Sequence, residues 1–66
     1  MQTVVFIEVE HERGSTVALG EAPLEIVPRA GEMVRIAGKE YTVRRVEHTI
    51  FLPEKARHVV SVIVTA

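Results

Sequence analysis

The sequence predicts a single all-β domain, folded as a small five-stranded barrel with mostly antiparallel hairpins. Runs of alternating apolar and polar residues recur along the chain. Turns rich in glycine and proline separate these runs at intervals of about 8–12 residues, which is typical of barrels and sandwiches. The apolar residues are mainly Val, Ile and Leu, and the stretch 20–31 contains two prolines, so no long helix is expected.

The length and composition set limits on how the domain is stabilised. The chain has 66 residues, all in one domain 1–66, and a domain of this size buries only about 60% of its unfolded surface. It has no cysteine, which excludes disulfides and thiolate zinc sites. Neither a structural metal nor a cofactor is expected. Association with a second copy or another protein is therefore the expected source of extra burial.

The N-terminal half is predicted to hold one long strand and two short ones. Residues 2–10 alternate with a period of two, with one apolar face and a second face that turns acidic toward its end. Residues 13–15 form a turn signal. Two β-prone runs follow, 16–19 and 24–27. The second lies between prolines, which cannot donate to a ladder, so an edge strand or an extended connector is expected there.

A hairpin is predicted in the middle of the chain. Residues 33–37 form its first strand, with Val34 and Ile36 inward and Arg35 outward. Gly38-Lys39 is the expected turn, of type II′ because glycine comes first. The second strand runs over 40–52.

The alternation along residues 40–52 slips by one residue at Arg44-Arg45. Such a slip predicts a β-bulge, which would bend the strand and help the barrel to close. After a polar loop at 53–56, residues 57–66 form the last strand.

Both faces of the last strand are largely apolar. Either this strand crosses the barrel centrally, or its outer face meets a partner. The segment 50–52, beside the last loop, is also apolar, so it too is either buried in the barrel or in contact with a partner. The candidate interface residues are Val59, Ile63, Ile50, Phe51 and Leu52.

The segment VPRAGEMVRIAGKEYTVRRVEH, residues 27–48, resembles small SH3-like barrels found among uncharacterised phage and bacterial proteins. In these barrels a proline and then Gly-Glu introduce a strand, and a glycine hairpin leads to a strand of the type Tyr-x-Val-x-x-Val. The match covers about a third of the chain. SH3-like barrels bind RNA, DNA or peptides, connect virion parts or form oligomers, so the resemblance implies binding or assembly rather than one activity.

Basic side chains could gather near the predicted hairpin and bind phosphate or carboxylate, because arginine contacts either group through two donors. A nearby tyrosine could stack on a base. The candidate residues are Arg35, Lys39, Tyr41, Arg44 and Arg45. The alternative is that these arginines pair with the glutamates of the first strand, Glu8, Glu10 and Glu12. The charge distribution favours pairing, since residues 1–28 carry a net charge of −4 and residues 29–66 carry +3.

Two histidines, His48 and His58, flank the last loop, but they are not expected to be directly paired across the two strands. A loop centred near residues 54–55 would place His48 opposite about Ser61, and a metal site completed by Glu47 or Glu54 is not expected. Catalysis is not expected either. The chain has no Cys or Asp, its two serines lie in no nucleophile motif, and its glycines are isolated.

No signal peptide is visible, and no stretch approaches the roughly 18 apolar residues that span a membrane. We therefore expect a cytoplasmic protein with no membrane partner. The leading hypothesis is a non-catalytic protein-binding or assembly module, of the phage accessory or inhibitor type, that forms a homo-oligomer through its last strand. The alternative hypothesis is a binder of nucleic acid or nucleotides that uses the arginine cluster.

Overall fold

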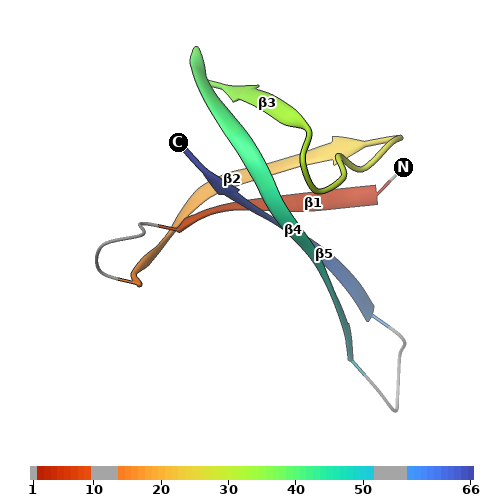
Figure 1. Cartoon of the computed structure of the whole chain (residues 1–66). Coiled ribbons are helices and arrows are strands. Elements are labelled where there is room, and N and C mark those ends of the chain that lie inside the picture. Colours follow the sequence, from red (N-terminus) through yellow and green to blue (C-terminus); the bar gives the residue numbers. More distant parts are fainter. Residues whose placement is uncertain (1, 10–13, 52–56) are drawn as a thin grey trace.

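The computed structural model describes residues 2–9, 14–51 and 57–66, and these residues form five strands with no helix (Figure 1). The strands are β1 (Gln2–Val9), β2 (Thr16–Leu24), β3 (Met33–Ile36), β4 (Lys39–Phe51) and β5 (Arg57–Thr65). The prediction of a small all-β fold is confirmed. The predicted turn at residues 13–15 and the loop at 53–56 lie partly or wholly outside the described residues.

The strands make one sheet in the order β2-β1-β5-β4-β3. Three neighbouring pairs are antiparallel, as expected, whereas β1 and β5 are parallel. The sheet is strongly curled, and the long β4 crosses the β1–β2 pair steeply in Figure 1. The terminal strands β2 and β3 do not contact each other. The fold is therefore a half-barrel with an open seam between these two strands.

The prediction of two short runs at 16–19 and 24–27 is wrong, because β2 continues through Gly20 and Pro23 as one strand. Phe6 pairs with Gly20 and Ile7 with Ala18, so Leu19 is an extra residue in β2. Such a bulge lets the strand continue past the extra residue. Gly20 has a φ of 140°, which glycine adopts without strain. Proline fits here because β2 is an edge strand.

The turn between β3 and β4 is displaced by one residue from the prediction. Ile36 pairs with Lys39, so the two turn residues are Ala37 and Gly38. Their φ angles are 52° and 82°. Positive φ at both positions is the mark of a type I′ turn, not of the predicted type II′.

The predicted bulge in β4 is confirmed. Val43 pairs with Val64 and Arg45 with Ile63, which leaves Arg44 as the extra residue. Because of this extra residue, side chains before and after the bulge can face the same side of the sheet. Val43 and Val46 both belong to the inner face as a result.

The core lies on the concave face of the curled sheet. Its buried side chains are Val4, Tyr41, Val43, Val60, Val62 and Val64. β5 is central in the sheet, with β1 on one side and β4 on the other. On its convex face Ile63 is also buried, with 3% of its surface exposed. Of the two explanations for the apolar faces of this strand, the central position is the one observed.

Backbone hydrogen bonds join the connection before β3 to β4. The Gly31 N–H donates to the carbonyl of Val43 over 2.9 Å, and the Val43 N–H donates to the carbonyl of Glu32 over 2.8 Å. The Arg29 N–H in turn donates to the Glu32 carboxylate. These bonds hold β3 and the segment before it at one side of the open seam.

Candidate binding groove

The open seam between β2 and β3 forms a groove with a volume of about 580 Å³. Apolar side chains from β1, β2, β3 and the connection after β2 line most of it. They are Phe6, Leu19, Ala22, Leu24, Ile26, Val34 and Ile36. A large apolar hollow with few polar groups is the usual form of a binding site.

Local alternation directs these side chains into the groove. In β3, Val34 and Ile36 are half-buried and Arg35 is exposed, as the sequence predicted. In β2, Ala22 pairs with the core residue Val4. Directly paired residues share a face of the sheet, so Ala22 faces inward. The groove is thus the uncovered continuation of the core.

The two rims of the groove differ in charge and belong to the two terminal strands of the sheet. Glu21 lines the β2 side and Arg35 the β3 side. β2 and β3 are the terminal strands of the sheet, so no strand among residues 2–9, 14–51 and 57–66 pairs with the outer edge of either. Ile26 lies at the groove with 85% of its surface exposed, and Met33 at the start of β3 is 64% exposed. A large apolar side chain, Ile26, is therefore open to solvent at the groove.

Sequence reasoning did not identify this groove. Its residues read as ordinary core positions, since a side chain that faces inward looks the same whether the barrel closes or not. The proline at position 23 indicated an edge strand nearby, and that was the available signal.

Two of the candidate basic residues form ion pairs with glutamates. Arg35 pairs with Glu40 across the hairpin over 2.7 Å, and Arg45 pairs with Glu47 over 2.8 Å. The carboxylate partners of Arg35 and Arg45 are Glu40 and Glu47, which belong to β4 and not to the first strand. Arg44 is exposed at the bulge. Glu10 and Glu12 lie outside the described residues.

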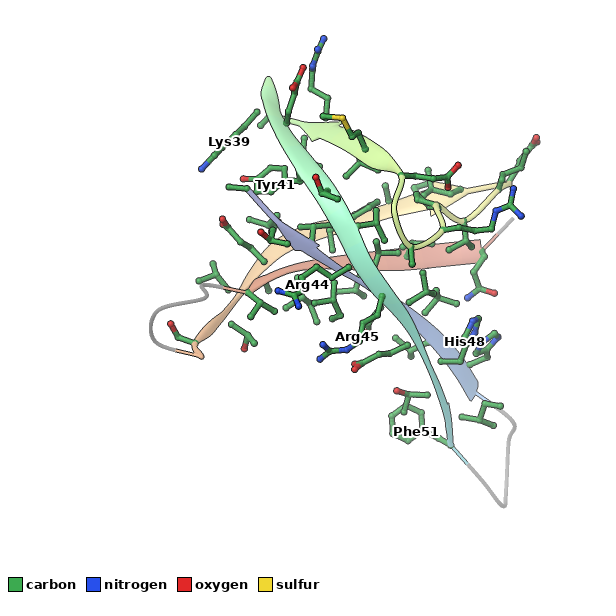
Figure 2. All side chains as sticks on the ribbon, viewed as in Figure 1. Lys39, Tyr41, Arg44, Arg45, His48 and Phe51 are labelled. Atoms are coloured by element: carbon green, nitrogen blue, oxygen red, sulfur yellow. The ribbon has the colours of Figure 1, made fainter. Side chains whose placement is uncertain are left out.

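Tyr41 is not the open stacking surface that the sequence suggested. Only 6% of its surface is exposed, because the ring belongs to the core. Lys39 places its ammonium 5.5 Å from the ring centroid, in a cation–π contact. Figure 2 shows Lys39 beside Tyr41 at one end of β4, with Arg44 and Arg45 farther along the same strand. The ring therefore has no face free for a base.

The candidate interface residues fall into two groups. Ile63 is buried within the monomer and Val59 is half-buried, both on central β5. Ile50 and Phe51 are 61% and 51% exposed at the end of β4. Figure 2 shows Phe51 far from Lys39 and Tyr41. Leu52 lies outside the described residues. An assembly surface near the last strand would therefore use the exposed residues at the end of β4, and not Ile63.

The two histidines are brought together by a register that differs from the predicted one. His48 pairs with Val60 instead of Ser61, and His58 pairs with Ile50. This places both histidines on one face as diagonal neighbours. Nδ1 of His48 lies 2.8 Å from Nε2 of His58, within hydrogen-bond distance, and the rings stack with centroids 5.0 Å apart. As expected, the two histidines are not directly opposite each other in the ladder, but their rings meet diagonally across it.

Comparison of this chain with protein-family models, with curated protein sequences and with solved structures gives no match. Among residues 2–9, 14–51 and 57–66, no helix is long and apolar enough to span a bilayer. The same residues hold no group of three or more His, Cys, Asp or Glu side chains arranged to bind a metal ion.

Proposed function

We propose that this chain is a non-catalytic protein-binding module whose open seam holds an extended segment of another polypeptide. The observation that carries the proposal is the coincidence of an apolar groove with two free strand edges, on β2 and β3. An added strand gains main-chain hydrogen bonds from a free edge, and alternate side chains enter the groove. Such a segment would cover the part of the core that the half-barrel leaves open.

The lining of the groove favours a polypeptide over a nucleic acid. Its walls are mainly apolar, and Arg35 at the rim already pairs with Glu40. A nucleic-acid site needs cations directed at phosphates and faces for stacking. The buried ring of Tyr41 offers no such face.

A second copy of the chain is one possible source of the added strand. The last strand offers no free edge for this purpose, because β5 pairs with β1 and β4. Self-association would instead use β2 or β3. Native mass spectrometry of the purified protein distinguishes the two sources: a dimer indicates a second copy, and a monomer indicates a different partner.

The experiment is a selection from a displayed random-peptide library, with tag-free protein as the bait. We expect selected peptides to alternate apolar and polar residues, because only alternate side chains of a strand enter the groove. Ile26→Lys should abolish their binding. Ile50→Lys is the matched control, since it places the same charge on another exposed isoleucine outside the groove. If the wild type is a dimer, Ile26→Lys should return it to a monomer while Ile50→Lys should not.

Backbone NMR of the complex locates the bound segment. Amide shifts should concentrate in the ranges 19–24 and 33–36. The proposal fails if the selected peptides tolerate Ile26→Lys, or if their shifts map to the end of the β4–β5 hairpin. A wild-type monomer that yields no binding peptide would also count against it.

A further inference from the structure

The β3 edge of the open seam can be described down to its individual backbone groups. In an antiparallel ladder, hydrogen-bonded pairs alternate with pairs whose N–H and C=O groups point away from each other. The two-residue turn makes Ile36 and Lys39 a hydrogen-bonded pair. The bond from the Val43 N–H to the Glu32 carbonyl follows the same alternation. The even-numbered residues of this segment therefore bond to β4.

The odd-numbered residues of β3 direct their backbone groups into the seam. Met33 and Arg35 pair with Thr42 and Glu40 without exchanging hydrogen bonds. Each of the two therefore points one N–H and one C=O past the edge of the sheet. No strand among residues 2–9, 14–51 and 57–66 pairs with that edge. β3 thus offers two complete sets of donor and acceptor to an added strand.

The edge of β2 offers fewer donors. Pro23 has no N–H and pairs with Thr3. A hydrogen-bonded pair needs a donor from each residue, so this pair is of the other kind, and the nitrogen of Pro23 points outward. By the same alternation, the next outward groups are those of Glu21. These two positions hold one donor where β3 holds two, and proline on an edge strand hinders the addition of another strand.

The side chains of β3 divide between the two faces of the sheet. Val34 and Ile36 line the groove, whereas Arg35 lies on the other face, paired with Glu40 over 2.7 Å. Directly paired residues share a face. An antiparallel strand bonded to Met33 and Arg35 therefore places one side chain opposite Arg35. Its two neighbours in sequence enter the groove, opposite Val34 and Ile36.

On the basis of the proposed function, we propose that the bound segment pairs antiparallel with β3 and not with β2. Its core sequence is apolar–acidic–apolar, with the acid opposite Arg35. Glu40 accepts from Nη2 of Arg35, and a guanidinium has five N–H donors, so a second carboxylate can bind from the side of the added strand. The groove, of about 580 Å³, is large enough for bulky side chains at both flanking positions.

The bound segment belongs to a different polypeptide. β2 of a second copy would bring Glu21 opposite Arg35, but the flanking residues, Gly20 and Ala22, are too small to fill the groove. β3 of a second copy has the sequence MVRI and contains no acid. In the described sheet β1, β4 and β5 have neighbours on both sides, so they have no edge to offer.

A bait with exchanged charges tests the acidic position. Arg35→Glu with Glu40→Arg reverses both charges and keeps an ion pair across the hairpin. In selections from a displayed random-peptide library, the wild type should yield Asp or Glu between two bulky apolar residues. The exchanged variant should yield Lys or Arg at that position. Arg45→Glu with Glu47→Arg is the matched control, because it exchanges an ion pair outside the groove and should still select acidic peptides.

Proline substitutions test which edge is used. Met33→Pro removes an outward N–H of β3, and Glu21→Pro removes one of β2, while the bonds to the neighbouring strands remain. The probe is the tightest-binding peptide from the wild-type selection, titrated by calorimetry. We expect Met33→Pro to weaken binding at least about fivefold, and Met33→Ala and Glu21→Pro to change it less than about twofold. In the wild-type complex the Met33 and Arg35 amides should exchange more slowly with solvent, and the Glu21 amide should not.

The outcomes separate this proposal from the proposed function. Peptides that lose binding to Ile26→Lys and to Glu21→Pro but tolerate Met33→Pro would place the segment on β2, which overturns the pairing with β3 and leaves the groove as the site. Acidic peptides from the charge-exchanged bait would overturn the contact with Arg35. A wild-type dimer in native mass spectrometry would overturn the choice of a different polypeptide. If the wild type selects no peptide, both proposals fail. The charge-exchange selection does not use the proline variants, so it decides the question even if Met33→Pro does not fold.

Discussion

Ala37→Asn should stabilise the protein, because the β3–β4 turn holds an alanine in the left-handed region. Ala37 has a φ of 52° and is followed by Gly38 at 82°. A residue with a Cβ pays about 1–2 kcal/mol in this conformation, and asparagine tolerates it better through local hydrogen bonds. Ala37 is exposed, so the exchange changes no core packing. We expect a gain of about 0.5–1 kcal/mol in the free energy of unfolding.

Thermal unfolding followed by circular dichroism measures this gain. For a domain of this size, 1 kcal/mol corresponds to about 4–8 °C in the melting temperature, so a rise of about 2–8 °C is expected. Ala30→Asn is the matched control, since Ala30 is an exposed turn residue outside the left-handed region. Gly38→Ala should lower stability by about 1 kcal/mol through backbone strain alone, because nothing lies within 4 Å of the added Cβ. An equal rise for Ala30→Asn, or no rise for Ala37→Asn, would refute the assignment of a type I′ turn.

Three further predictions concern the core and the surface ion pairs. Val62→Ala removes a fully buried side chain from the central strand and should cost about 2–3 kcal/mol in urea unfolding, from lost burial plus the cavity left behind; a loss below about 0.5 kcal/mol would contradict the core assignment. Ile63→Lys should unfold the chain or cost about 3 kcal/mol or more, because it buries a charge on the convex face; a stable, folded monomer would show that Ile63 serves an interface instead. Arg45→Ala should change stability by less than about 1 kcal/mol, since both members of its pair with Glu47 are half-exposed or more; a larger loss, abolished by high salt, would show that the pair contributes more than surface pairs normally do.

Strands that show an alternation of apolar and polar residues could be predicted from the local sequence. The period of two over β1 and β3 is a local property, because successive side chains of a strand point to opposite faces whatever the neighbours are. The bulge at Arg44 was visible for the same reason, as one extra residue shifts the pattern. In β2 the local signals predicted a break that is not there. Gly20 and Pro23 usually interrupt strands, but an edge strand with a bulge accommodates both.

Which strands are neighbours, and in which register they lie, could not be predicted from local sequence and follows from the folded sheet. The parallel pairing of β1 with β5 joins the two ends of the chain, and no local pattern specifies it. A shift of one residue in the β4–β5 hairpin brought His48 and His58 to one face, because the side-chain period of two makes register decisive. The groove followed from the sheet's curl, which leaves β2 and β3 apart. An inward-facing residue carries the same local pattern in a closed barrel and in an open one, so only the full arrangement of strands distinguishes core from binding site.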